Sequence, residues 1–280
     1  VLNFKIGAYH NRDRGYFTNK FDGRRFGLAN TVILRGALEF KPTETITLLA
    51  KGEIFDSEGD GPAAQNHGLF SRDSFDFSIN NRGSYGARAK FATLRTDIEV
   101  GENGKITNIF GYRDYKGATD ADIDSTPNTI FYSTTRLEQD QLSNELRYAG
   151  SFGLADLTIG GYWFTQDVAY DEVRFIGANR FYGGGKQDHD VYGVFAALDF
   201  DLTEALTLSA GIRWSQEDKD AAVTYVRPRA PCSVIDGSCP VSGVNPTIPA
   251  ENNGFVDAQS WKNWTPRLGA QYRLGDDTQV

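Results

Sequence analysis

Short turns and long polar segments alternate along this chain, and this asymmetry limits the possible folds more than any other feature. Tight turns are predicted at residues 42–45, 101–104, 150–155, 201–204 and 275–278. Long polar connections separate them near 57–85, 116–135, 170–189 and 218–261, with a shorter one over 11–30. Each strand-like stretch therefore has a tight turn at one end and a long loop at the other, so consecutive strands are antiparallel. Transmembrane β-barrels sort their connections in this way, whereas a soluble sandwich has no reason to.

The composition excludes one class of membrane protein and leaves another open. The chain has 280 residues, of which 40% are hydrophobic and 13% aromatic. Its mean hydropathy is -0.44 and it contains no run of about 18 apolar residues, which excludes a helical membrane span. A barrel escapes that test because only every second residue of a strand faces lipid. The net charge of -8 argues against a nucleic-acid partner, since phosphate binding needs clustered Lys and Arg.

Strict alternation of apolar and polar residues marks the strand pair 191–200 and 206–214. Along the first strand, one face carries Tyr192, Val194, Ala196, Leu198 and Phe200. Eight steps of ~3.3 Å at a tilt of ~40° give a height of roughly 20 Å. This height is close to that of the apolar band of an outer-membrane barrel.

A second strand pair, 32–41 and 46–55, repeats the pattern and collects its charges on one side. These charged residues are Arg35, Glu39, Lys51 and Glu53. In a barrel that face lines a hydrated lumen, whereas in a soluble sandwich it meets solvent. Further stretches bring the expected number of strands to about ten, at 2–10, 86–100, 105–115, 137–149, 156–166 and 262–274. A change of phase within 86–100 indicates a β-bulge or a shifted strand boundary.

Both ends of the chain lie within strand patterns. The sequence contains no Met and no leading signal segment, and it ends as another strand begins. We therefore expect residues 1–280 to form a single domain, an antiparallel arc cut from a larger transmembrane β-barrel. Such an arc alone would expose two unpaired edges, which lipid does not tolerate.

Cysteine and histidine, which often act in catalysis or metal binding, are few in this chain. Cys232 and Cys239 lie in the longest polar segment, where a disulfide fits an oxidising compartment such as the periplasm or cell surface. Free thiols are one alternative, and a metal pair is another, but no His or further Cys is nearby to complete a zinc site. The histidines His10, His67 and His189 are far apart and are interpreted as solvated loop residues. No catalytic motif emerges, so neither an enzyme nor a resident cofactor is expected.

Two loop motifs suggest ligands but complete no known site. Asp120, Asp122 and Asp124 form a D-x-D-x-D run, yet Ser125 and Phe131 stand where an EF-hand needs Gly and Glu. A looser surface calcium site stays open. The run 183–186 (GGGK) lacks the spacing of a phosphate loop and is interpreted as a flexible external loop.

Aromatic residues give two further hypotheses. Arg180, Phe181 and Tyr182 precede the glycine run and could meet a ligand by charge and stacking, although an ordinary exposed loop is the simpler interpretation. The four tryptophans are interpreted as anchors at the membrane interface, where an amphipathic ring meets headgroups. They are Trp163, Trp214, Trp261 and Trp264.

Four segments, in this order, resemble the barrel domain of TonB-dependent outer-membrane receptors. They are ITNIFGYRDY at 106–115, QLSNELR at 141–147, LTLSAGIRW at 206–214, and WTPRLG at 264–269 running into YRLGDD at 272–277. The resemblance covers nearly the whole chain. It implies a 22-stranded barrel with an N-terminal plug domain, and TonB-energised import of a scarce ligand, most commonly an iron-siderophore complex. The plug, the segment that contacts TonB and the terminal barrel strand of that family have no counterpart in this sequence.

The sequence therefore predicts part of a receptor in the bacterial outer membrane. Its expected partners are membrane lipid, a small ligand such as a ferric siderophore, and the TonB system acting through the missing plug region. One alternative is a passive porin-like channel. Another is a soluble β-sheet domain that binds carbohydrate, in which Val194, Leu198, Leu208 and Ile212 would be buried under a second layer.

Overall fold

The computed structural model describes residues 1–239, 254–275 and 278–279, and within them it consists of β-strands and their connections, without a helix. Accordingly, no helix in this described part is long and apolar enough to cross a membrane. All strands belong to one 11-stranded sheet, in which each strand pairs with its neighbours in sequence. In chain order they are β1 (Leu2–Thr18), β2 (Arg25–Phe40), β3 (Ile46–Gly59), β4 (Ser84–Val100), β5 (Gly104–Asp122), β6 (Phe131–Phe152), β7 (Ala155–Ile176), β8 (Asn179–Thr203), β9 (Leu206–Pro228), β10 (Gly254–Gly275) and β11 (Thr278–Gln279).

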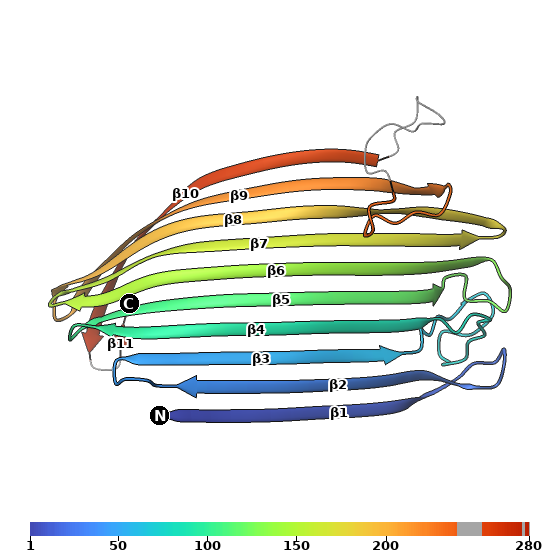
Figure 1. Ribbon diagram of the computed structural model, residues 1–280, viewed down its shortest axis with the longest axis horizontal. Coiled ribbons are helices and arrows are strands. Elements are labelled where there is room, and N and C mark those ends of the chain that lie inside the picture. Colours follow the sequence, from blue (N-terminus) through green and yellow to red (C-terminus); the bar gives the residue numbers. More distant parts are fainter. Residues whose placement is uncertain (240–253, 276–277, 280) are drawn as a thin grey trace.

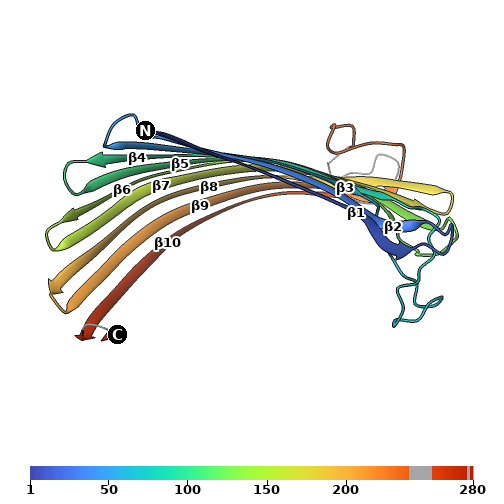
Figure 2. The ribbon, with the colours of Figure 1, turned by 90° about the horizontal axis from the view of Figure 1, so that it is seen from below.

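The sheet is open and curved. β1 lies at one edge and β11 at the other, and the strand order does not return to β1 (Figure 1). Seen from below, the strands arch along their length, so that the sheet has a convex and a concave side (Figure 2). All ladders are antiparallel. The predicted fold class, an antiparallel arc of about ten strands, is therefore confirmed.

The short turns lie together at one end of the sheet (Figure 1). They occupy 41–45, 101–103, 153–154 and 204–205, close to the predicted positions. The predicted turn at 275–278 falls partly outside the described residues. This clustering follows from the antiparallel order, because every second connection lies at the same end.

The connections at the other end are shorter than predicted, because the strands continue into the polar segments. The gaps between strands cover 19–24, 60–83 and 123–130, and the last begins at 229. The long connection predicted at 170–189 is wrong. There β7 and β8 stay paired up to Ile176 and Asn179, and Gly177 turns the chain with a φ of 58°. Backbone pairing needs no apolar alternation, so hydrophobic periodicity does not detect strands beyond the apolar region.

The β-bulge considered for 86–100 is absent. β4 pairs with β3 and with β5 in unbroken register from end to end. The change of phase arises because apolar side chains move from one face to the other. Ala89 and Phe91 lie on the concave face, and Leu94 and Ile98 lie on the convex face. The period-two pattern reports which face is apolar, and here that face switches within one strand.

A small core lies at the long-loop end, between the ends of β1 and β2 and the loop 60–83. Phe26, Phe77 and Ile79 are almost fully buried and pack with Phe17. Asn19 fixes the loop beside them, since its side-chain amide donates to the Ile79 carbonyl at 2.8 Å and accepts from the Ile79 N–H at 3.1 Å.

An ion pair anchors the loop 60–83 to the sheet. Asp60 accepts from Arg82 at 2.6 and 2.8 Å, and from the backbone N–H groups of Gly27 and Leu28. Burial raises the pKa of Asp60, but the Arg82 guanidinium and the two N–H donors outweigh it and lower the pKa below 3.8.

Candidate functional site: a wall with an apolar and a polar face

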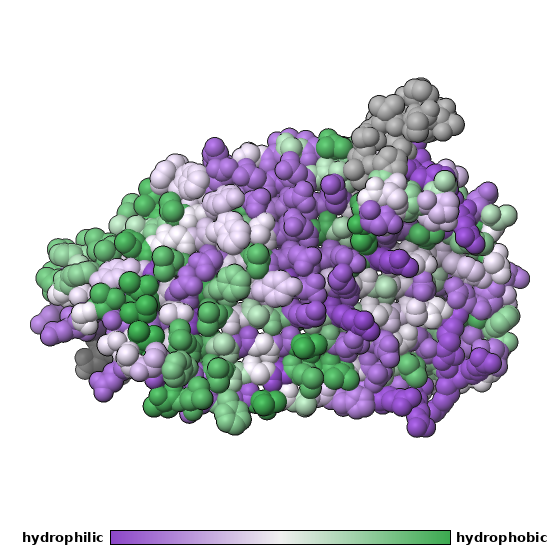
Figure 3. Space-filling model, viewed as in Figure 1, coloured by the Kyte–Doolittle hydropathy of each residue, from purple (hydrophilic) through white to green (hydrophobic). Residues whose placement is uncertain are grey.

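The convex face carries a continuous apolar band across ten strands. Reading across the strands by paired residues gives its larger members: Leu2, Phe4 and Ile6 in β1; Leu34, Leu38 and Phe40 in β2; Leu48 and Ile54 in β3; Leu94 and Ile98 in β4; Ile106, Phe110 and Tyr112 in β5; Leu142, Leu146 and Tyr148 in β6; Leu157, Ile159 and Trp163 in β7; Tyr192, Val194, Leu198 and Phe200 in β8; Leu206, Leu208, Ile212 and Trp214 in β9; and Trp264, Leu268 and Tyr272 in β10. Hydrophobic side chains cover the half of this face nearer the short turns (Figure 3).

No other part of the described chain covers this band. Val194 is 54% exposed, Leu198 39% and Ile212 49%, although all lie in the middle of paired strands. An apolar surface of this extent is not stable in water and marks a contact with lipid or protein. The alternative of a soluble domain with these side chains under a second layer is therefore not supported.

Aromatic residues border the apolar band on both sides, toward the long loops and toward the short turns. Tyr112, Trp163, Tyr192, Trp214 and Trp264 end it toward the long loops. Phe40, Tyr148, Phe200 and Tyr272 end it toward the short turns. Such paired aromatic girdles are typical of transmembrane β-barrels.

One of the four predicted tryptophan anchors is wrong. Trp261 is three residues from Trp264 and therefore points to the opposite, concave face. There its ring lies 5.8 Å from the ammonium group of Lys219. The sequence pattern could have shown this, since an odd spacing within one strand separates two side chains onto different faces.

The concave face is polar, and several of its charges form ion pairs. Arg35 and Glu53, directly opposite each other in β2 and β3, form an ion pair. Asp97 accepts from Arg95 at 2.7 Å and from the Thr107 hydroxyl at 2.7 Å. The prediction that the charges of these strands project to one side is confirmed, and that side is the concave one.

A cluster of ionisable and aromatic side chains lies on the concave face toward the long loops. His189 Nε2 lies 3.0 Å from Glu217 Oε1, and Lys219 Nζ lies 2.6 Å from the same oxygen. Phe164 meets the His189 ring edge-on at 5.3 Å between centroids, and Trp261 closes the cluster beside Lys219. His189 is thus a strand residue within a charged network and not the solvated loop residue that was expected.

Arg113 forms a second feature of this wall. Its guanidinium lies 5.6 Å from the centroid of Phe91 and 5.7 Å from that of Tyr115. Its buried Nε has no hydrogen-bond partner among the described residues. The positive charge of this guanidinium, which lies beside two aromatic rings, can attract a negatively charged group.

The predicted trio Arg180, Phe181 and Tyr182 lies in β8 and not in a loop. Alternation places Arg180 and Tyr182 on one face and Phe181, opposite Arg174, on the other. Tyr182 is only 7% exposed. The structure therefore does not bring the three side chains to one surface.

The glycine run that follows is also part of β8, so its interpretation as a flexible loop is wrong. A Cβ on Gly183 would lie 2.7 Å from the backbone of Thr224 and of Val226 in β9. Close approach of two strands, and not flexibility, accounts for glycine here.

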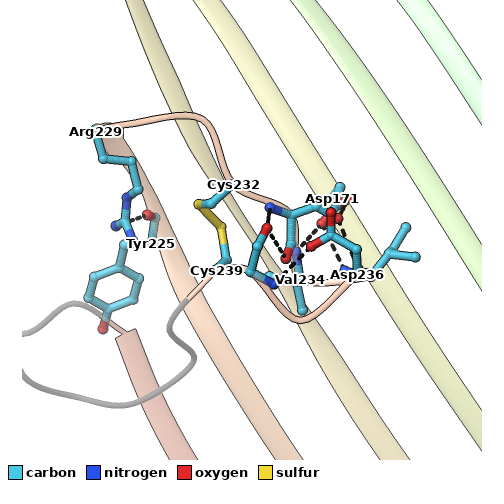
Figure 4. Close-up of a disulfide and its surroundings, with 10 residues drawn as sticks. Asp171, Tyr225, Arg229, Cys232, Val234, Asp236 and Cys239 are labelled. Atoms are coloured by element: carbon cyan, nitrogen blue, oxygen red, sulfur yellow. Dashed lines mark hydrogen bonds between the residues drawn. A yellow bond between two sulfur atoms is a disulfide. The ribbon is translucent and has the colours of Figure 1, made fainter.

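The two cysteines are joined as a disulfide, with 4.8 Å between their Cα atoms (Figure 4). The loop that they close docks on Asp171 of β7. The carboxylate of Asp171 accepts from the backbone N–H of Val234 at 2.6 Å and of Ile235 at 3.2 Å, and from the Ser233 hydroxyl. Because Asp171 is 7% exposed, these donors satisfy a buried charge and fix the loop against the strand.

The aspartates of the D-x-D-x-D run stabilise the loop between β5 and β6. Asp122 accepts from the N–H of Ser125 at 3.0 Å, and Asp124 from that of Phe131 at 2.8 Å. Burial raises the pKa of Asp122, although the backbone N–H groups of Asn81 and Ser125, which donate to its carboxylate, oppose the shift. Within the described residues no group of three or more His, Cys, Asp or Glu side chains is placed to hold a metal ion.

A curved antiparallel sheet with an apolar convex face and a charged concave face is the wall of a transmembrane β-barrel. The family model described as TonB dependent receptor-like, beta-barrel, matches residues 3–280, and the chain belongs to this family. A search of curated protein sequences finds no match.

Solved receptors show the same fold at low sequence identity. The ferric yersiniabactin uptake receptor FyuA from Yersinia pestis superposes with a TM-score of 0.75 at 14% identity, over 100% of this chain and 41% of FyuA. The siderophore receptor PiuA from Acinetobacter baumannii gives 0.66 at 10%, over 98% and 44%. The unliganded ferric citrate transporter FecA gives 0.64 at 13%, over 98% and 37%. The chain thus spans less than half the length of these proteins.

Proposed function

We propose that this chain forms part of the wall of an outer-membrane receptor that imports a ferric siderophore with energy delivered by TonB. The observation that carries the proposal is the separation of faces. The convex apolar band fits acyl chains, and the concave face offers cations and aromatic rings to a passing ligand. Inner-membrane energy would act through a plug domain of the whole receptor.

The chemistry of the concave face supports a negatively charged, oxygen-rich ligand. The Arg113 guanidinium lies beside the rings of Phe91 and Tyr115, and Lys219 lies beside Trp261. Siderophores are multidentate oxygen chelators, and their iron complexes are commonly anionic. The structural neighbours are named for ferric yersiniabactin, ferric citrate and siderophore uptake, which agrees with this ligand class.

Uptake of radioactive iron by the full-length receptor tests the proposal. The receptor is expressed in cells that lack their own siderophore receptors, with and without functional TonB, and supplied with a panel of ⁵⁵Fe-siderophores. We expect saturable uptake of at least one complex, only in the cells with TonB. Uptake that is linear in concentration and independent of TonB would instead support the passive channel.

Two matched variants test which face binds the ligand. Lys219→Gln removes a charge from the concave face, and Lys186→Gln removes the same charge from the convex face of β8. We expect Lys219→Gln to weaken ligand binding and Lys186→Gln to leave it unchanged. Equal effects of both variants would contradict a ligand path along the concave face.

A further inference from the structure

We propose that a pocket on the convex face, beyond the apolar band, binds a negatively charged sugar of the glycolipid in the outer leaflet. The inference rests on the membrane location in the proposed function but concerns a site separate from ligand import. The pocket has a volume of about 470 Å³, within the range of roughly 300–1,000 Å³ found for small-molecule sites. The lining residues used below are Ser84, Asp120, Tyr132, Thr134, Phe175 and Arg180.

The pocket shares its face with the lipid-contacting residues. Ser84, Asp120 and Thr134 are direct partners across β4, β5 and β6, and the register between these strands is unbroken. Because successive residues of a strand alternate between faces, Asp120 lies on the same side as Tyr112 of the aromatic border. The pocket therefore opens away from the concave face, where an imported ligand would pass.

The height of the pocket places it among headgroup sugars. Eight residues separate Tyr112 from Asp120, and at ~3.3 Å per residue and a tilt of ~40° this puts Asp120 roughly 20 Å beyond the aromatic border. Acyl chains end at that border. A molecule that reaches this side of the sheet at this height belongs to the saccharide layer of the outer leaflet.

The hydrogen-bonding groups of the pocket suit a polyhydroxylated ligand. The hydroxyl groups of Ser84 and Thr134 both donate to Asp120, at 2.9 and 2.6 Å. Since their hydrogens are used, the two hydroxyl oxygens and the carboxylate face the pocket as acceptors. A cluster of acceptors fits a partner rich in hydroxyl donors, which is what a sugar provides.

The aromatic and cationic groups add selectivity for an anionic substituent. Tyr132 and Phe175 stack with 6.1 Å between centroids, and the Arg180 guanidinium lies 5.3 Å from the centroid of Phe175. Tyr132 is fixed in place by donating to Asn80 at 2.8 Å. Arg180 has no ion-pair partner within the described part of the chain, so its fork of N–H groups is available to a phosphate or carboxylate.

Calorimetric titration of the delipidated full-length receptor tests this site. The probe is the phosphorylated core oligosaccharide released from lipopolysaccharide by mild acid. We expect saturable binding that Arg180→Gln weakens roughly tenfold, the value of one charge-assisted hydrogen bond. Phe175→Leu, which removes the ring but no charge, should weaken it as well. Arg72→Gln makes the same charge change in the loop 60–83, outside the pocket, and should not alter the affinity.

Three results would overturn the inference. The first is no binding of the oligosaccharide to the unsubstituted receptor, and the second is unchanged affinity in Arg180→Gln with native circular dichroism. The third is tighter binding of a free sugar acid, such as galacturonate, which would assign the pocket to a soluble ligand. Siderophore uptake is measured separately on the unsubstituted receptor, so failure of the import proposal and failure of this site give different results.

Discussion

Replacing Ala196 with arginine tests which face of the sheet meets lipid. Ala196 is midway along the convex row of β8 that runs from Tyr192 to Phe200. Four residues on either side, at ~3.3 Å each and a tilt of ~40°, place it roughly 10 Å from each aromatic border. This is the centre of the apolar band. An arginine at the midplane of an outer-membrane barrel costs about 2–4 kcal/mol, which lowers the folding equilibrium constant roughly 30- to 1,000-fold.

The neighbouring residue provides a matched control. Ala197 points to the concave face, where it lies opposite Thr158 and Gly211. Ala197→Arg makes the identical substitution one residue along, on the side that we expect to be hydrated. Its expected effect is within about 0.5 kcal/mol, as for an ordinary surface substitution.

Equilibrium folding of the full-length receptor into phosphatidylcholine vesicles, followed along a urea gradient, gives both values. The free energies follow from the midpoints and slopes of the unfolding curves. Equal penalties for the two arginines, or a larger penalty for Ala197→Arg, would refute the assignment of the convex face to lipid.

Three further predictions concern the long-loop end of the sheet. First, mass spectrometry of a non-reduced digest should show the peptides of Cys232 and Cys239 joined to each other, and Cys232→Ser should expose the Cys239 thiol to maleimide; labelling of Cys239 in the unsubstituted protein would contradict the disulfide. Second, the pKa of Asp60 is lower in the folded than in the unfolded protein, so its carboxylate stabilises the loop above pH 3.8, and this stabilisation is lost as the pH falls through the folded pKa. Cleavage within 60–83 by an acid-active protease should therefore increase on acidification. Asp60→Asn should show the increased cleavage already at pH 7. Third, Gly183→Ala should destabilise the hairpin end by about 1–3 kcal/mol through overpacking, whereas Gly86→Ala, with nothing within 4 Å of its added carbon, should not; equal urea midpoints would contradict this.

The sheet could be predicted from the sequence because its apolar band imposes a strict period of two. Leu206 to Trp214 shows this most clearly, and its residues occupy the convex face as expected. The external ends could not be predicted in the same way. Between 170 and 189 neither face carries a continuous apolar row, so the alternation disappears although the backbone ladder continues.

The concave cluster was missed for a different reason. His189, Glu217 and Trp261 come from β8, β9 and β10, and only the register of the ladders brings them together. Register depends on where each turn begins, and the turn boundaries were predicted only approximately. The sequence offered one signal: within its own strand, each of these residues is an odd number of positions from the residues of the convex apolar row. Such a spacing assigns all three residues to the concave face.

We expect the acidic residues directly beyond the apolar band to determine how deep the sheet sits in the membrane. On the convex face Asp114 follows Tyr112, Asp140 follows Leu142, and Asp190 follows Tyr192. On the face shown in Figure 3, hydrophilic side chains border the apolar area on the side away from the short turns. Asp114 and Asp140 also face each other directly across the ladder, an arrangement of like charges that destabilises paired strands unless water screens it. An aspartate at the bilayer centre costs about 2.5–3.5 kcal/mol on insertion scales. Movement of the sheet into the bilayer would bring several such carboxylates toward hydrocarbon together, so the aspartates complement the aromatic border in holding the apolar band at one level.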